Sequence, residues 1–245
     1  MAKIDDVLEA ALNSLEVKPD QNATQAAKKR YSELLSQKLA LVLGAELRAR
    51  GLKEARPAEV GELDSSGAER RMAGGIGAKK VDVTWTTEES GLLLAISIKS
   101  INFADRKTGN YQKNLTNRRG DMLMEAVTLH RRFPYAVLAA FFFLDKGAES
   151  DGTAKRKSTF LNAHARLKLF TGRNDPDGRD EQFERFYIIL VEASPSASKV
   201  EAYEVGKPDK VVPMDKIIDD LLSLTAERNA DFYEFSNGKL VSAQG

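Results

Sequence analysis

Residues 81–99 read VDVTWTTEESGLLLAISIK, and this stretch predicts two paired β-strands. Apolar and polar side chains alternate along both halves, with the period of two that is typical of a strand. The polar residues between the halves, which end in Gly91, indicate a turn. A turn centred between Glu89 and Ser90 gives an antiparallel hairpin in which Asp82 lies opposite Ser97.

The two faces of this hairpin carry different side chains. Opposed residues share a face and residues two apart repeat it, so Asp82, Ser97 and Lys99 are expected on one side of the sheet. A shift of the register by one residue would separate them, so this prediction depends on the position of the turn. The other side is expected to face the core and to carry Val81, Val83, Trp85, Leu94, Ile96 and Ile98.

The rest of the chain predicts an α/β fold with a mixed central β-sheet flanked by helices. We expect one structural unit, made of an N-terminal helical segment over 1–60 and a core over 61–245. Helices are expected over 4–15, 31–50, 68–73, 121–131, 153–170 and 214–228. Further strands are expected over 135–144, 186–192 and 200–205, followed by a C-terminal hairpin over 232–241.

The composition restricts the kind of site that the chain can build. The sequence contains no cysteine and two histidines, His130 and His164. Disulfides, thiolate zinc sites, cysteine nucleophiles and multi-histidine metal sites are therefore excluded. Any metal would be held by oxygen ligands, which suits Mg²⁺ or Mn²⁺.

No stretch of the sequence has the character of a signal peptide or a membrane span. Together with the absence of cysteine, this favours a cytoplasmic protein without a membrane partner. The glycine-rich stretch Gly74–Gly77 lacks the lysine of a phosphate-binding P-loop and the spacing of a dinucleotide site, so no nucleotide cofactor is expected.

The net charge of +1 hides an uneven distribution along the chain. Basic side chains outnumber acidic ones between Lys99 and Arg132, which predicts a local anion-binding surface. Basic, amide and tyrosine side chains occur together there, and proteins use such side chains to bind DNA phosphates and base edges. The DNA-binding candidates are Lys79, Lys80, Asn102, Arg106, Lys107, Lys113, Asn114, Asn117, Arg118 and Arg119.

The helix expected after the basic stretch continues the set of polar candidates. Asn117, Asp121, Glu125 and Thr128 recur at helical spacing and form one polar stripe. An Asp and a Lys on paired strands, followed by a carboxylate on a helix, suit metal-assisted hydrolysis of a phosphodiester. In that chemistry two carboxylates bind Mg²⁺ and the ammonium positions water or offsets developing charge.

The residues Val81-Asp82 and Ser97-Ile98-Lys99 resemble the PD-(D/E)xK signature of restriction-endonuclease-like nucleases. The resemblance covers about residues 69–144 and implies that 61–245 is a nuclease core. It makes Asp82 the metal-binding first acid and Lys99 the catalytic lysine. It also implies that Glu69 is the glutamate that the family often places on a preceding helix, where it would complete the metal site.

Two positions depart from this signature. Val81 stands in place of the proline, and Ser97 stands in place of the second acid, which removes a metal ligand. Similar restriction enzymes with serine there carry the acid on the following helix, and Glu125 is our candidate for it. Asp121 is the alternative that we favour less.

The resemblance implies an Mg²⁺-dependent endonuclease that cleaves double-stranded DNA, with Mn²⁺ as a possible substitute. It implies a type II restriction enzyme or a related phage-defence nuclease, acting as a homodimer whose two sites cut two strands. Two alternatives remain. One is a structure-selective nuclease for repair or junction resolution, and the other is a DNA-binding module with a decayed site, for which Ser97 is the main argument.

Overall fold

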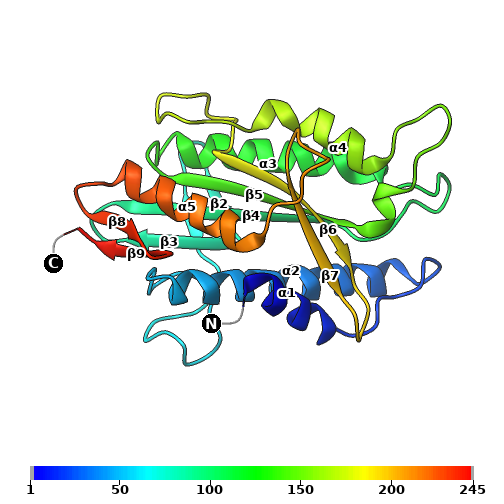
Figure 1. Ribbon diagram of the computed structural model, residues 1–245, viewed down its shortest axis with the longest axis horizontal. Helices are drawn as coiled ribbons and strands as arrows, with labels where there is room; N and C mark the ends of the chain where they lie inside the picture. Colours follow the sequence, from blue (N-terminus) through cyan, green and yellow to red (C-terminus); the bar gives the residue numbers. More distant parts are fainter. Residues whose placement is uncertain (1–2, 244–245) are drawn as a thin grey trace.

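The computed structural model describes residues 3–243 and has a five-stranded mixed β-sheet at its centre (Figure 1). Residues 1–2 and 244–245, at the outer ends of the two expected segments, lie outside the described residues. The strands β4, β5 and β6 are mutually parallel, and the edge strands β3 and β7 are antiparallel to their neighbours. In sheet order the strands are β3 (Val83–Thr87), β4 (Gly91–Ile101), β5 (Val137–Asp145), β6 (Arg185–Glu192) and β7 (Lys199–Glu204).

Helices cover both faces of this sheet, which confirms the expected α/β layout. Figure 1 shows α1 and α2 along one side and α3 and α4 along the other. One face packs against α1 (Ile4–Asn13), α2 (Gln25–Ala49) and α5 (Met214–Arg228). The other packs against α3 (Leu115–His130) and α4 (Thr159–Leu167). Short 3₁₀ turns are η1 (Gln112–Asn114), η2 (Lys146–Glu149) and η3 (Lys168–Phe170).

The N-terminal helices belong to the main core. Leu8 of α1 and Leu35 of α2 are buried in the same cluster as Val83 and Phe141 of the sheet. Helix α2 begins where Thr24 Oγ1 accepts a hydrogen bond from the Ala27 N–H at 3.2 Å, a side-chain cap for an otherwise unpaired backbone donor. Burial of apolar side chains is the main favourable term in folding, so this packing ties both helices to the sheet.

The register expected for the first hairpin is confirmed as far as Trp85, but a bulge after Trp85 shifts the pairs next to the turn by one residue, to Thr86–Leu92 and Thr87–Gly91. Val83 pairs with Ile96 and Trp85 pairs with Leu94, which places Asp82 level with Ser97 just before β3 begins. The expected core set lies in one buried cluster except for Val81, which is buried in the opposite cluster. The reason is that Asp82 lies in a bend, so the chain leaves the regular alternation there.

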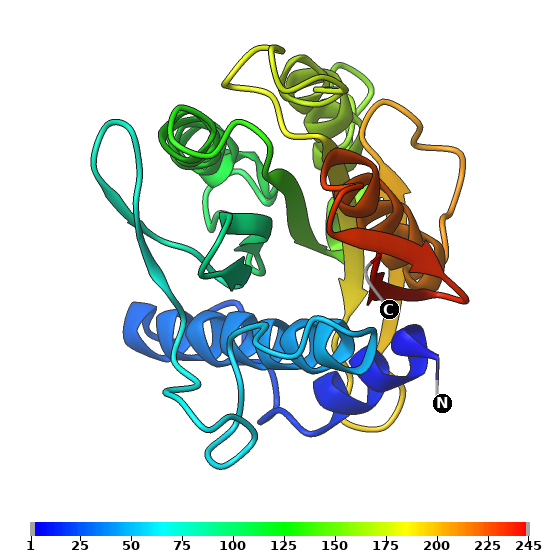
Figure 2. The same cartoon turned by 90° about the vertical axis from the view of Figure 1, so that its left-hand side faces the viewer.

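The helix expected over 68–73 is wrong. Residues Arg71–Ala73 form β1, which pairs with β2 (Ala78–Lys80), and Glu69 precedes this hairpin rather than lying on a helix. A helix of that length is unfavourable in isolation, whereas the glycines before β2 allow a tight turn. The turn packs on α3, where Gly75 N–H donates to Thr128 O at 2.8 Å and a Cβ on Gly74 would lie 2.4 Å from that oxygen. Figure 2 shows this part of the chain, in cyan, passing from α2 to α3.

The other boundaries differ by a few residues. The helix expected over 153–170 begins only at Thr159, because residues 153–156 form a turn and Ser158 caps the helix through Leu161 N–H. Helix α3 begins earlier than expected, at Leu115, and α5 matches the expected helix over 214–228.

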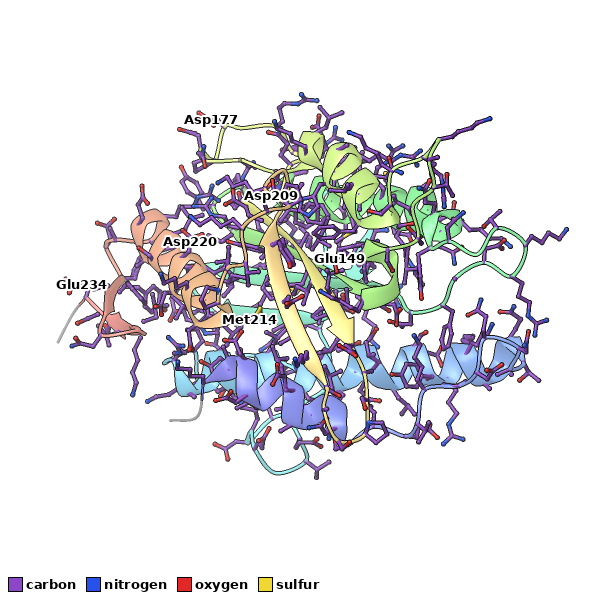
Figure 3. All side chains as sticks on the ribbon, turned by 45° about the vertical axis from the view of Figure 1, so that its right-hand side comes forward. Glu149, Asp177, Asp209, Met214, Asp220 and Glu234 are labelled. Carbon is purple, nitrogen blue, oxygen red and sulfur yellow. The ribbon has the colours of Figure 1, made fainter. Side chains whose placement is uncertain are left out.

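The C-terminal part packs on the sheet through α5 and a small hairpin. Figure 3 labels Met214 and Asp220 on α5, and Asp220 forms an ion pair with Arg185 of β6. The expected Asn-Gly hairpin is present as β8 (Tyr233–Ser236) and β9 (Lys239–Ser242), with φ of 50° at Asn237 and 73° at Gly238. Among residues 3–243, no helix has both the length and the apolar run that a membrane span needs.

Candidate active site

Lys99, on β4, lies between two carboxylates. Its Nζ is 3.4 Å from Asp82 Oδ2 and 3.2 Å from Glu125 Oε2, and it is also 3.2 Å from Ser97 Oγ. Asp82 comes from the bend before β3, Ser97 from β4 and Glu125 from α3. Four of the five expected catalytic residues therefore meet around one ammonium group.

Asp82 is held in place by the hairpin itself. The backbone N–H of Ile98 donates to Asp82 Oδ2 at 2.7 Å, and the same oxygen faces Lys99. Such hydrogen bonds to an ionised acceptor are stronger than neutral ones. The paired register positions this carboxylate, because Ile98 is the residue after the one opposite Asp82.

Glu125 is the more deeply buried of the two carboxylates. Its residue is 5% exposed, and Oε1 has no hydrogen-bond partner among the described residues. Burial raises the pKa of Glu125, and the charge of Asp82 raises it further, although Lys99 acts in the opposite direction. An unpaired buried carboxylate oxygen is costly, which indicates that this oxygen is available to a further ligand.

Asp121, the less favoured alternative, is placed differently. It lies one turn before Glu125 on α3, is exposed, and faces Arg118 at 3.9 Å. The polar stripe expected on this helix therefore divides, with Asp121 at the surface and Glu125 and Thr128 buried.

Lys99 remains an ammonium at this depth. Burial by itself lowers the pKa of Lys99, but the charges of Glu125 and Asp82 and their hydrogen bonds outweigh it, and the pKa is raised. The lysine can therefore donate hydrogen bonds and offset negative charge, whereas it cannot act as a base near neutral pH.

Glu69 lies beside this cluster without joining it. Its Oε2 is 2.5 Å from Lys80 Nζ, and this hydrogen bond raises the pKa of Lys80, with a smaller contribution from Asp82. Glu69, Lys80 and Lys99 line the same cleft. The structure thus places Glu69 near the candidate site but pairs it with a lysine.

The donor set can be tested against the expected metal. In the part of the chain that the structure describes, no group of three or more histidine, cysteine, aspartate or glutamate side chains is arranged to hold a metal ion. Mg²⁺ in nucleotide and nucleic-acid sites is commonly held by one or two carboxylates, with water and substrate phosphate as its other ligands. Asp82 and Glu125 fit that smaller requirement, and the unpartnered Glu125 Oε1 is the observation that supports it.

Lys99 opens onto a cleft of about 1760 Å³. One wall is the basic stretch that follows β4 and includes Lys107, Lys113 and Arg118. The opposite wall, which sequence reasoning missed, is a face of α2 with the loop 57–69. The sequence carries a signal for this wall, because the polar side chains of α2 recur at helical spacing opposite the buried Tyr31, Leu35 and Leu39. The α2 side chains that line the cleft are Gln25, Lys28, Lys29, Ser32, Glu33, Ser36 and Gln37.

The DNA-binding candidates fall into two groups. Most are at the surface: Arg106, Lys107, Lys113, Asn114 and Arg118 line the cleft, and Lys79, Asn114, Asn117 and Arg118 line an adjoining hollow of about 790 Å³.

Three of the candidates, Asn102, Arg106 and Arg119, have internal contacts, and the first two also line the cleft. Asn102 is buried, and its amide donates to Ser32 Oγ at 2.9 Å and Ser100 Oγ at 3.1 Å. Arg106 donates to the backbone of Asn22, and Arg119 lies over the Phe170 ring at 5.8 Å. The amide donors of Asn102 are thus used within the fold, where they position the end of the strand.

Two carboxylates, an ammonium and a hydroxyl thus meet, and of these four residues Lys99 lines the cleft, which has basic side chains on one wall. This arrangement can bind a cation through the carboxylates and an anionic substrate through the basic wall. Comparison of the chain with protein-family models, with curated proteins and with solved structures gave no match.

Proposed function

We propose that the chain is an Mg²⁺-dependent endonuclease of the restriction-endonuclease-like type that hydrolyses double-stranded DNA in the cytoplasm. The observation that carries this proposal is the position of Lys99, whose Nζ lies 3.4 Å from Asp82 and 3.2 Å from Glu125 at the edge of the cleft. Paired acids with a charged lysine are the donor set that metal-assisted phosphodiester hydrolysis requires.

The local fold supports this proposal. Asp82 lies in a bend at the start of an edge strand, and Lys99 lies on the neighbouring strand of a mixed sheet, as the PD-(D/E)xK resemblance implies. Ser97 leaves the second acid position without a carboxylate, and Glu125 supplies one from α3. We assign Glu125, rather than Asp121 or Glu69, as the relocated acid.

Each residue has a role that follows from its contacts. Asp82 and Glu125 would hold Mg²⁺ or Mn²⁺, and when bound the metal polarises the phosphate and lowers the pKa of a coordinated water. Lys99 donates hydrogen bonds to the attacking water or the phosphate and offsets developing charge. Ser97 Oγ accepts a hydrogen bond from Lys99 and so fixes its direction.

The substrate class follows from the cleft. Exposed basic side chains beside an acidic site would bind the DNA backbone on either side of the scissile phosphate. We propose a restriction or phage-defence role, with a homodimer placing two sites on two strands. A junction-resolving or repair nuclease would use the same chemistry on a different DNA shape.

The experiment compares Glu125→Gln with Asp121→Asn, a matched control that neutralises an exposed carboxylate on the same helix. Supercoiled plasmid is incubated with each protein and Mg²⁺, with EDTA in a parallel set. We expect discrete fragments from wild type and Asp121→Asn, and no cleavage from Glu125→Gln or in EDTA. Full cleavage by Glu125→Gln would overturn the assignment of the acid, and cleavage only of branched DNA would favour the resolvase.

One observation favours a second function, a DNA-binding module without catalysis. Ser97 contributes no carboxylate, and Lys99 already forms ion pairs with both acids that are present. This function predicts that wild type binds duplex DNA in a gel-shift assay, yet leaves plasmid intact with Mg²⁺ and with Mn²⁺.

A further inference from the structure

Three buried polar groups without partners lie at the edge of the sheet near Asp82. They are Arg56 Nε, Arg70 Nε and Thr84 Oγ1, none of which has a hydrogen-bond partner among residues 3–243. Arg56 and Thr84 are directly paired by two backbone hydrogen bonds of 2.9 Å, and Val81 N–H donates to Arg70 O at 3.0 Å. Buried donors are nearly always satisfied in folded proteins, so three at one edge call for an acceptor.

The two arginines also lack a counter-charge. Neither guanidinium forms an ion pair within the described part of the chain, and the side-chain acceptor that Arg56 has is the neutral Ser65 Oγ at 2.8 Å. Burial lowers the pKa of Arg70, and the charge of Arg56 lowers it further, while Glu54 acts in the opposite direction. The backbones of Arg56 and Arg70 are hydrogen-bonded to Thr84 and Val81, three residues apart in the chain, so two half-buried cations lie at one edge of the sheet. This arrangement is unfavourable unless an anion joins them.

The two arginines lie next to the cleft. Neither is among the residues that line it, but their chain neighbours Pro57 and Glu69 both are. Arg56 is paired with Thr84, two residues after Asp82 in the chain. A guanidinium fork matches the oxygens of a phosphate, so two forks at this edge of the sheet suit such a group.

We propose that Arg56 and Arg70 together bind one phosphate-class oxyanion at this edge of the sheet, next to the cleft. The anion is either a backbone phosphate of DNA next to the scissile one or a free phosphate ion. The first source rests on the proposed nuclease function, whereas the oxyanion site itself does not. An anion there would neutralise two guanidinium groups that have no carboxylate partner among the described residues. It would also accept hydrogen bonds from Arg56 Nε and Arg70 Nε, which have no acceptor among those residues.

The first arm of the test uses inorganic phosphate on the full chain without metal. The midpoint of thermal unfolding is measured against phosphate, with chloride of equal ionic strength as reference. We expect a rise of roughly 3–6 °C at about ten times the dissociation constant. Arg56→Gln/Arg70→Gln should lose this rise, and the control Lys155→Gln/Lys157→Gln, which removes two charges from an exposed loop, should keep it.

Two results would overturn the site. One is a wild-type response to phosphate no larger than that to chloride, and the other is an unchanged response in the double glutamine variant. If that variant does not fold, Arg70→Lys keeps the charge and removes the fork. A severalfold weaker phosphate affinity by calorimetry then supports the site, and an unchanged affinity overturns it.

The second arm identifies the source of the anion. Metal-free binding of a short DNA duplex is measured for the same variants over a range of salt concentrations. If the pair holds a backbone phosphate, the double variant binds more weakly and its salt slope falls by about 0.9, the value for one phosphate contact. Unchanged DNA binding with a retained phosphate response in wild type assigns the site to a free phosphate ion. Neither arm requires cleavage, so the inference fails or stands separately from the nuclease function.

Discussion

The molecule contains two buried clusters of charge that differ in how completely they are satisfied. At one end of α3, Glu184 is fully buried and receives hydrogen bonds on both oxygens, from Arg173 and Arg228 on Oε1 and from His130 and Leu138 N–H on Oε2. Beside Lys99, which lines the cleft, Glu125 is nearly as buried, but its Oε1 has no partner among the described residues.

The pKa directions of the two glutamates show the consequence. Burial acts to raise the pKa of Glu184, but the hydrogen bond and charge of His130 and the charge of Arg228 lower it overall. Burial likewise acts to raise the pKa of Glu125. The charge of Lys99 lowers this pKa but does not offset the burial, and the charge of Asp82 raises the pKa further. We call the cluster around Glu184 saturated, because both carboxylate oxygens are hydrogen-bonded, and the cluster of Asp82, Lys99 and Glu125 unsaturated. A saturated cluster joins elements of the fold, whereas an unsaturated one beside a cleft is a candidate for function.

The largest expected effect is on the unsaturated cluster. Lys99→Met removes the ammonium between the two carboxylates, and we expect cleavage to fall about 10³-fold, equivalent to about 4 kcal/mol. Cleavage rate under single-turnover conditions is the measurement, with circular dichroism to show that the fold is kept. Lys53→Met, at an exposed position, is the control and should cleave as wild type does. Unchanged cleavage by Lys99→Met would mean that the cluster around Lys99, like the one around Glu184, has no role in catalysis.

The saturated cluster should respond in stability instead. Glu184→Gln places an amide N–H₂ among four donors, and we expect unfolding free energy to fall by about 3 kcal/mol, because the buried cations lose their partner. Denaturant titration measures this. The pKa of Glu184 in the folded protein is lowered below its unfolded value of about 4.3. Its contribution to the unfolding free energy is therefore present at a pH above the unfolded pKa and is lost as the pH falls through the folded pKa. The gap between the proteins should therefore close in acid, and a variant as stable as wild type at neutral pH would contradict this assignment.

The site around Lys99 could be predicted because its determinants are local. Asp82, Ser97 and Lys99 belong to one hairpin, and the observed pairs Val83–Ile96 and Trp85–Leu94 match the register expected from the alternation and the turn. The bulge after Trp85, which shifts the pairs next to the turn, was not predicted. Glu125 follows from helical periodicity together with the resemblance. The fold class could be predicted for the same reason, since long apolar runs with a clear period define strands and helices.

Other features depend on contacts that no local pattern shows. The partners His130 and Arg228 are 54 and 44 residues from Glu184 in the sequence, so their cluster has no periodic signal. The helix expected over 68–73 became a hairpin because the backbone around Gly74 packs on α3. The pair Arg56 and Arg70 forms only when the loop before β1 closes over the edge of β3.

A smaller effect is expected on the stability of the unsaturated cluster. Glu125→Gln removes a buried charge that is incompletely compensated, so we expect unfolding free energy at neutral pH to rise by about 1 kcal/mol while cleavage is lost, a trade of activity for stability. The pKa of Glu125 in the folded protein is raised above its unfolded value of about 4.3. Wild type is therefore most stable relative to the variant at a pH below the unfolded pKa, and it loses that stability as the pH rises through the folded pKa. Denaturant titrations at pH 4 and pH 7 should show the gap only at pH 7. A destabilised variant at neutral pH would mean that Glu125 is held as firmly as Glu184.

The smallest effects are expected at the cleft wall, where the same contrast applies to exposed lysines. Lys113 Nζ is 2.7 Å from Asp105 Oδ2, and this hydrogen bond, with others from the backbone, lowers the pKa of Asp105 to about 2. Lys107 has no side-chain partner among residues 3–243 and is free to meet a phosphate. We expect Lys107→Ala to reduce the salt slope of metal-free duplex binding by about 0.9, and Lys113→Ala by less than half of that, because Lys113 must first leave Asp105. Fluorescence anisotropy at several salt concentrations measures both slopes. Equal slopes for the two variants would show that an existing ion pair does not decide which lysine binds DNA.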